Sequence, residues 1–191
     1  MVETILWCLA CLLPAGLVIA AVQRRNAIKR VAEPTFVFAD LAGYTALTER
    51  AGDQAAAQVA REFRRTMCLV SREHGAHQIK SMGDGVMIVA KDPAAGVAVA
   101  AHAVGRLGTR PDLLPVRVGV HTGPAVRRGC DWYGNSVNVA ARLAREAEPN
   151  EALISAATRR AANGKLGDRL AMRRDLPLRG LEHPVSAWRL A

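Results

Sequence analysis

The first apolar stretch of the chain runs from Thr4 to Val22 and contains no charged residue. Its nineteen residues would span roughly 28 Å as a helix, close to the thickness of a bilayer core. Only Glu3 carries a side-chain charge before this stretch, whereas Arg24, Arg25, Lys29 and Arg30 follow it. By the positive-inside rule, residues 1–22 are predicted to form one transmembrane helix with the rest of the chain in the cytoplasm.

A cleaved secretory signal is the alternative for this segment, because Val18-Ile19-Ala20 resembles a cleavage site. The segment lacks a basic region at its start, and the charges after it oppose translocation. We therefore favour a single-pass anchor in the cell membrane. Residues 23–34 then form a short basic linker that ends at Pro34.

The pattern after the linker predicts a strand, a long helical region and a hairpin. Residues 35–39 (TFVFA) are apolar and rich in β-branched and aromatic side chains, and Asp40 follows them. Apolar residues recur at helical spacing between 45 and 73, which indicates one or two helices. Two short strands, 77–80 and 86–90, flank a turn-rich segment with Asp84 at its tip.

The second half of the chain continues the alternation of predicted strands and helices. Asp92-Pro93 is typical of a helix start, and the helix should run to about Arg106. The later elements are a strand (116–121), a turn (122–124), the start of a strand (125–127), a helix (136–146), a strand (152–154) followed by a short helix, and a terminal hairpin (176–190). The order β, α, β, β, α, β favours an α+β fold, a ferredoxin-like sandwich whose mainly antiparallel sheet carries helices on one face.

Length and charge add broad limits. A chain of 191 residues holds one ordinary domain and a short appendage. Its formal net charge of +9 attracts nucleic acid, anionic lipid or nucleotide phosphates. The chain shows no basic patch interleaved with aromatic residues, so we expect no specific nucleic-acid partner.

The cysteines and histidines give no sign of a metal site in the sequence. The four cysteines show no zinc-ligand spacing, and we expect free thiols in a reducing compartment. The five histidines form no metal-spaced pair and are predicted to be structural: His74, His77, His102, His121 and His183.

Two aspartates are candidates for metal binding. Asp40 ends the first strand and Asp84 lies in the Gly83-Asp84-Gly85 turn, so the two carboxylates are expected side by side in a ferredoxin-like sheet. A divalent cation would neutralise their repulsion, and oxygen ligands suit Mg²⁺ or Mn²⁺. The backbone amides from Leu41 to Thr45 (Leu41, Ala42, Gly43, Tyr44, Thr45) are candidates for cradling phosphates. The structural alternative is a helix cap at Asp40 and a turn residue at Asp84.

A third segment, Asp131 to Arg142 (DWYGNSVNVAAR), carries a second set of polar groups. Asn138 and Arg142 are four residues apart and share one face of the predicted helix. A guanidinium and an amide on one face suit a phosphate and a ribose. Taken alone, the segment fits better with Arg142 as a solvated helix charge and Asn138 as a weak helix former, because charged surface positions usually have no specific function.

Together, these segments resemble the catalytic domains of class III adenylate and guanylate cyclases. FADLAGYT resembles the first metal motif, IKSMGDG the second metal motif with its base-reading lysine, and DWYGNSVNVAAR the purine and transition-state motif. The likeness runs from about Thr35 to Arg189, so residues 35–191 are expected to form the catalytic domain.

The resemblance implies a role for each position. Asp40 and Asp84 would bind two metal ions, Mg²⁺ or Mn²⁺, with the Leu41 carbonyl as an extra ligand. Lys80 and Asp131 would contact the purine, Asn138 would orient the ribose, and Arg142 would stabilise the charged phosphate. The family divides these residues between two subunits, so a chain that carries all of them is expected to form a homodimer.

The base-contacting pair favours adenine. Adenine has an acceptor at N1 and an amino donor at N6, which match a lysine and an aspartate. Guanylate cyclases of the family have Glu and Cys at these places. The resemblance therefore implies an adenylate cyclase that converts ATP to cyclic AMP and pyrophosphate. The alternatives are a guanylate cyclase and a non-catalytic nucleotide-binding or regulatory module.

Overall fold

The computed structural model describes residues 33–191. The predicted membrane helix, residues 1–22, and most of the 23–34 linker lie outside this range. Among the described residues, no helix is both long and apolar enough to cross a membrane. Of the four cysteines, Cys68 and Cys130 lie within the described range and both are free thiols.

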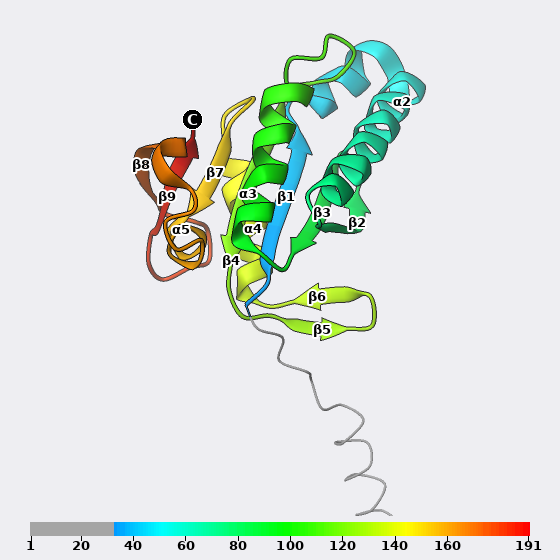
Figure 1. The fold of residues 1–191 in the computed structure, drawn as a ribbon. Coiled ribbons are helices and arrows are strands. Elements are labelled where there is room, and N and C mark those ends of the chain that lie inside the picture. Colours follow the sequence, from blue (N-terminus) through cyan, green and yellow to red (C-terminus); the bar gives the residue numbers. More distant parts are fainter. Residues whose placement is uncertain (1–32) are drawn as a thin grey trace, which may run out of the picture.

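The centre of the fold is a seven-stranded sheet with the strand order β2-β3-β1-β4-β7-β9-β8 (Figure 1). Its strands are β1 (Thr35–Leu41), β2 (His77–Met82), β3 (Gly85–Ala90), β4 (Val116–Thr122), β7 (Ala152–Ser155), β8 (Leu170–Leu176) and β9 (Val185–Leu190). Every neighbouring pair is antiparallel except β4 and β7, which are parallel. The order β2-β3-β1-β4 confirms the predicted ferredoxin-like core, and β7, β9 and β8 extend it.

A separate two-stranded ribbon projects from one end of the sheet (Figure 1). It consists of β5 (Val126–Arg128) and β6 (Asp131–Tyr133), joined by a tight turn. Trp132 anchors the ribbon, because its ring packs edge-on against Phe36 of β1 with the ring centroids 5.8 Å apart. The sequence predicted β5 but not β6, which is only three residues long.

Helices cover both faces of the sheet, so the expectation of helices on one face was wrong. The helices are α2 (Tyr44–Glu73), α3 (Pro93–His102), α4 (Asn135–Glu146) and α5 (Ala156–Ala161). Val37 and Ala39 of β1 belong to the core cluster that contains residues of α2 and α3. Phe36 and Phe38 belong to a second cluster with residues of α4. An apolar strand without polar alternation is buried on both faces, which is the physical reason for the second layer.

Local sequence signals explain where the helices begin and bend. Asp92 caps α3 by accepting a hydrogen bond of 3.0 Å from the Ala94 amide, as predicted. The helix continues from His102 into a π-helical turn, η1 (Ala103–Leu107). Gly52 has φ 83° and ψ 163°, which splits α2 into two helical segments. A 3₁₀ turn, η2 (Gly167–Arg169), precedes β8.

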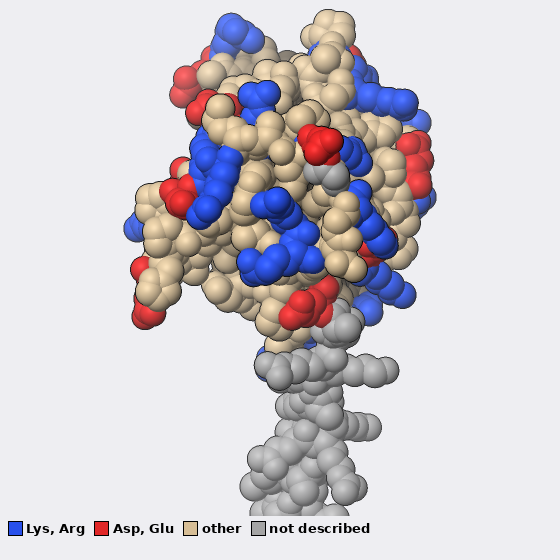
Figure 2. Space-filling view, turned by 60° about the vertical axis from the view of Figure 1, so that its left-hand side comes forward, with Lys and Arg blue, Asp and Glu red and all other residues tan. Residues whose placement is uncertain are grey.

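The Lys and Arg side chains of the described residues lie at the surface of the domain. No Lys or Arg among residues 33–191 is fully buried. Figure 2 shows Lys and Arg side chains gathered across the middle of one face, with acidic side chains around them. The core is instead built from aliphatic side chains, alanine and a few aromatic rings.

Candidate active site

Asp40 lies within β1, one residue further into the strand than the sequence suggested. Its pairing partners are Gly85 on β3 and Arg117 on β4. The carboxylate accepts a hydrogen bond of 2.7 Å from Arg117 Nη2. A Cβ atom at Gly85 would lie 3.2 Å from Asp40 Oδ1, so the absence of a side chain there leaves room for the carboxylate.

Asp84 occupies the two-residue turn between β2 and β3, next to Gly83 with φ +61°. Arg64 of α2 donates a hydrogen bond of 3.0 Å to the Gly83 carbonyl, which ties the turn to the helix. Asp40 and Asp84 line one pocket of about 290 Å³, together with Arg145 of α4. The structure therefore brings the two predicted carboxylates together.

The electrostatics of this pocket fit a divalent cation. Burial raises the pKa of the Asp40 carboxyl above its usual value, and the charge of Asp84 raises it further. The Arg117 and Arg145 guanidinium groups act in the opposite direction. Two partly buried carboxylates that repel each other form a hard oxygen donor set of the kind that Mg²⁺ and Mn²⁺ prefer. Class III cyclase domains use divalent metal ions, and these residues suit one.

Lys80 of β2 and Asp131 of β6 form an ion pair of 2.8 Å. Asp131 also accepts a hydrogen bond of 2.8 Å from the Trp132 amide. The hydrogen bond from Lys80 holds the pKa of the Asp131 carboxyl below its usual value, and the Trp132 amide adds to this. A fixed donor and a fixed acceptor thus lie side by side where the sheet meets the β5–β6 ribbon.

Asn138 and Arg142 both lie on α4, as predicted. Asn138 is exposed and Arg142 is half-buried. The Arg142 guanidinium lies beside Gly180 in the β8–β9 connection, where a Cβ atom would be 3.4 Å from Nη2. Arg142 Nη1 is buried without a hydrogen-bond partner among the described residues.

The two sets of polar residues do not share a pocket within one chain. The residues that line the pocket of Asp40 and Asp84 include Ala141, Ala144 and Arg145 of α4, but not Asn138 or Arg142. Lys80 and Asp131 are not among them either. Within one chain, the two carboxylates therefore lie in a pocket that Lys80, Asp131, Asn138 and Arg142 do not line.

The predicted phosphate cradle between Leu41 and Thr45 needs a correction. The Ala42 amide donates to the Pro115 carbonyl at 2.8 Å, so it is not available to a phosphate. Leu41 is buried in the core and Tyr44 packs against it. Gly43, with φ +82°, begins α2, and Thr45 is exposed in its first turn. The amides at the start of α2 remain candidates for contacting a phosphate.

Arg117 and Arg145 are the site residues that the sequence did not single out. Arg117 stands opposite Asp40 in the β1–β4 register, and Arg145 faces the pocket from α4. The alternation of the 116–121 strand does place Arg117 on one face, but it does not reveal which strand lies beside it. Only the strand order shows that Arg117 lies beside Asp40.

The family model of the adenylate and guanylate cyclase catalytic domain matches residues 27–191. The chain belongs to this family. An uncharacterized protein of Mycobacterium tuberculosis is 34% identical over 154 residues, which cover 80% of this chain and 40% of that protein. An adenylate cyclase of Glutamicibacter nicotianae is 36% identical over 122 residues, 63% of this chain and 30% of that protein.

A pH-sensitive adenylate cyclase of Mycobacterium tuberculosis is 34% identical over 137 residues, 70% of this chain and 32% of that protein. This cyclase domain thus spans 30% to 40% of the length of these three relatives.

Solved structures show the same fold. A structure of adenylate cyclases from Trypanosoma brucei has a TM-score of 0.77 at 21% identity, covering 84% of this chain and 88% of the other. The adenylyl cyclase CyaB from P. aeruginosa has a TM-score of 0.65 at 24% identity, covering 83% and 93%. The mixed fold with a mainly antiparallel sheet is therefore that of the cyclases.

Proposed function

We propose that this chain is an adenylate cyclase that converts ATP to 3′,5′-cyclic AMP and pyrophosphate at sites shared across a homodimer. The observation that carries the proposal is the division of the site into two halves. Asp40 and Asp84 share one pocket, whereas Lys80 pairs with Asp131 outside it. A twofold dimer would bring the carboxylate half of one protomer against the base-binding half of its partner.

Asp40 and Asp84 would hold two divalent ions, Mg²⁺ or Mn²⁺, with the Leu41 carbonyl as an additional ligand. When bound, such ions lower the pKa of the ribose 3′ hydroxyl and polarise the phosphate oxygens. Arg117 and Arg145 both act to lower the pKa of Asp40, and they add positive potential around the pocket. This positive potential favours binding of the negatively charged triphosphate of the substrate.

The residues of the other half would orient the substrate. Lys80 would donate a hydrogen bond to adenine N1, and Asp131 would accept one from the N6 amino group. Asn138 would position the ribose, so that its 3′ oxygen bonds to the α-phosphorus as the bond to pyrophosphate breaks. Arg142 would supply positive charge where negative charge develops on that phosphate, and the hydroxyl proton would pass to solvent.

The preference for ATP over GTP rests on the Lys80–Asp131 pair. The pair lies at 2.8 Å, with donor and acceptor fixed together. Two relatives that are 34% and 36% identical are adenylate cyclases by name, which supports the same substrate here.

The direct test offers ATP and GTP together with Mg²⁺ or Mn²⁺ and analyses the products. Cyclic AMP in excess is expected. An excess of cyclic GMP would contradict the substrate, and binding of ATP without turnover by a verified dimer would contradict the enzyme.

We also propose that residues 1–22 anchor the protein in the cell membrane, with the catalytic domain in the cytoplasm. The uncharged run and the basic residues after it support this. After expression of the full-length chain, the protein should sediment with membranes through a high-salt wash and dissolve in detergent. Release by salt alone would contradict an inserted helix.

A further inference from the structure

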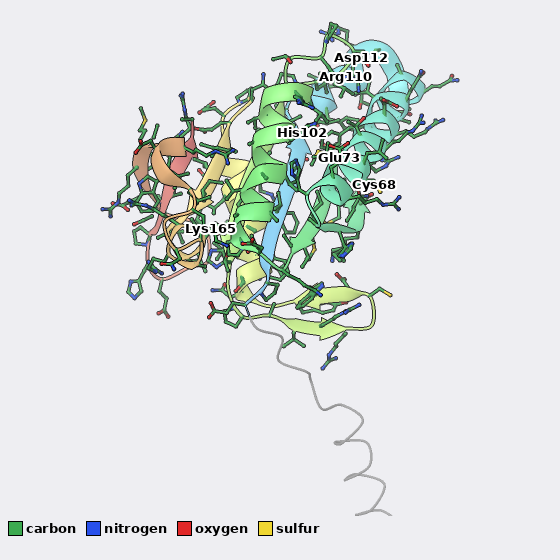
Figure 3. All side chains as sticks on the ribbon, viewed as in Figure 1. Cys68, Glu73, His102, Arg110, Asp112 and Lys165 are labelled. Atoms are coloured by element: carbon green, nitrogen blue, oxygen red, sulfur yellow. The ribbon has the colours of Figure 1, made fainter. Side chains whose placement is uncertain are left out.

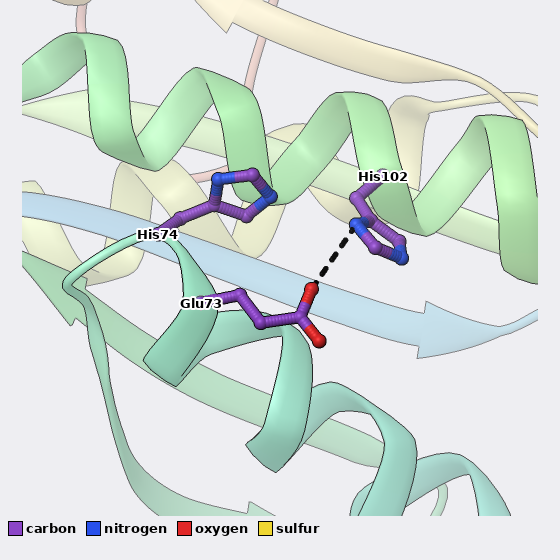
Figure 4. A group of neighbouring side chains, drawn as sticks. All are labelled: Glu73, His74 and His102. Carbon is purple, nitrogen blue, oxygen red and sulfur yellow. Dashed lines mark ion pairs between the residues drawn. The ribbon is translucent and has the colours of Figure 1, made fainter.

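Three potential metal ligands meet where α2 ends beside α3. Glu73 is the last residue of α2, His74 is its C-cap, and His102 is the last residue of α3 (Figures 3 and 4). One ligand atom from each lies within 4.8 Å of the others. Sequence spacing does not reveal this cluster, because His74 caps the end of one helix and His102 ends another.

The existing contacts do not satisfy these side chains. His102 Nδ1 and Glu73 Oε2 are 3.9 Å apart, which is too long for a hydrogen bond. The two imidazole rings lie edge to face, with their centroids 5.7 Å apart. His74 Nε2 is buried and has no hydrogen-bond partner among the described residues. An unpaired buried nitrogen is unfavourable, and a bound ion would satisfy it.

We propose that Glu73, His74 and His102 bind one divalent transition-metal ion of the Zn²⁺ class. Two imidazoles and one carboxylate form a donor set that suits zinc and leaves a fourth position for water. Mg²⁺ and Ca²⁺ prefer sites made of oxygen ligands, so this site is chemically distinct from the pocket of Asp40 and Asp84.

Small side-chain adjustments bring the ligands to binding distance. Tetrahedral zinc at about 2.0–2.2 Å from each ligand holds the ligand atoms about 3.3–3.5 Å apart. The Glu73 side chain is 61% exposed and has room to rotate, whereas the His102 side chain is only 16% exposed. The histidine thus provides a fixed ligand, and the glutamate closes on the ion.

The charge balance also allows a cation. Burial lowers the pKa of His102, and the neutral ring that this favours is the form that binds metals. Arg106 acts on the same ring, but Arg106 is exposed, so solvent screens its repulsion of an incoming ion. The carboxylate of Glu73 offsets part of the charge of the ion.

Occupancy would fasten α2 to α3 beside the start of β2. His74 lies shortly before β2, whose far end leads to the turn that holds Asp84. An ion here would therefore stiffen the connection between the long helix and the hairpin. Because an ion that binds only the folded state raises its stability, we expect the thermal midpoint to rise by several degrees in saturating Zn²⁺.

The test is a Zn²⁺ titration of the full-length chain in excess Mg²⁺, followed by calorimetry. The unmodified chain should bind one more equivalent of Zn²⁺ than His102→Ala, with an affinity in the micromolar range or tighter. Glu73→Gln, at an exposed position, should weaken that binding at least tenfold. His77→Ala is the matched control, since His77 is exposed, lies nearby on β2 and is outside the cluster.

Circular dichroism shows whether each variant folds. If His102→Ala does not fold, the comparison of Zn²⁺ binding with Glu73→Gln carries the test. Equal Zn²⁺ binding by the unmodified chain, His102→Ala and Glu73→Gln would overturn the proposal, as would the same loss in His77→Ala. The readout is binding and the thermal midpoint, so it is independent of whether the chain turns over ATP.

Discussion

Arg117 on β4 donates a hydrogen bond of 2.7 Å to the carboxylate of Asp40 on the neighbouring strand β1. The two residues are direct partners in the strand register. The side chains are 28% and 27% exposed, so their interaction is less screened by solvent than that of a surface pair. Arg117 thus opposes the rise in the pKa of Asp40 that burial and the neighbouring Asp84 cause.

Replacing this arginine should move the pH dependence of catalysis. Arg117 lowers the pKa of Asp40, so Arg117→Gln should raise that pKa further above its ordinary value. Metal binding requires the ionised carboxylate, and the acid limb of the kcat/KM profile should therefore shift to higher pH. Turnover measured across the acid range checks this. An acid limb that stays in place or moves to lower pH would show that Arg117 does not control Asp40.

Gly85 gives a steric test of the carboxylate position. In Gly85→Ala, the new Cβ atom would lie 3.2 Å from Asp40 Oδ1 and 3.4 Å from the Ala39 carbonyl. The carboxylate must then shift by a few tenths of an ångström, and we expect a severalfold rise in the Mg²⁺ or Mn²⁺ concentration needed for half-maximal activity. Gly105→Ala is the control, because nothing lies within 4 Å of its new Cβ atom. An identical metal dependence in both variants would contradict the account.

Gly119 marks the closest approach of α4 to the sheet. A Cβ atom there would lie 2.3 Å from the Ala140 carbonyl oxygen and 2.3 Å from the Ala144 amide nitrogen. Because both contacts are backbone, Gly119→Ala must displace the helix, at a cost of about 3 kcal/mol or more in unfolding free energy. Urea unfolding measures this. A variant of unchanged stability would show that α4 is not packed as described.

Because His121 is partly buried, we expect the folded protein to lose stability in mild acid. Burial lowers its pKa from 6.5 to about 4, with a contribution from Arg160, and the ring contacts Ser155 Oγ at 2.9 Å. Between these two values the unfolded chain binds the proton more readily, so stability falls as the pH drops below 6.5 and levels off below about 4. This residue should make the protein about 2 kcal/mol less stable at pH 5 than at pH 7.5.

The comparison variant for this effect is His121→Gln, which has no titratable ring. Its unfolding free energy should change less between the two pH values than that of the unmodified chain, by about the same 2 kcal/mol. Equal pH dependence in the two proteins would mean that His121 titrates normally in the folded state.

Local patterns in the sequence predicted most of the elements and the residues of the candidate site. The apolar strand before Asp40, the Asp92-Pro93 helix start and the turn around Asp84 are short-range signals that the fold preserves. The expected strand order predicted that the Asp40 and Asp84 carboxylates lie near each other, and in the structure both line one pocket.

Features that depend on long-range packing were missed. The burial of β1 on both faces, which places α4 opposite α2 and α3, needs the tertiary arrangement. Arg117 joins the site only through strand register, and His74 meets His102 only because two helices end side by side. The engagement of the Ala42 amide by Pro115 likewise depends on a contact distant in sequence.

The claim that each active site is shared between two protomers is tested most directly by mixing two inactive variants. Asp40→Ala removes a proposed metal ligand and Arg142→Ala removes the guanidinium proposed to contact the phosphate, so each homodimer should lose activity by at least about a hundredfold. A mixed dimer retains one intact site, and random pairing should restore about a quarter of full activity. Mixing Asp40→Ala with Asp84→Ala should restore none, since both lesions lie in the same half. Mixed Asp40→Ala and Arg142→Ala dimers, shown to form, that remain as inactive as the parents would contradict the shared site.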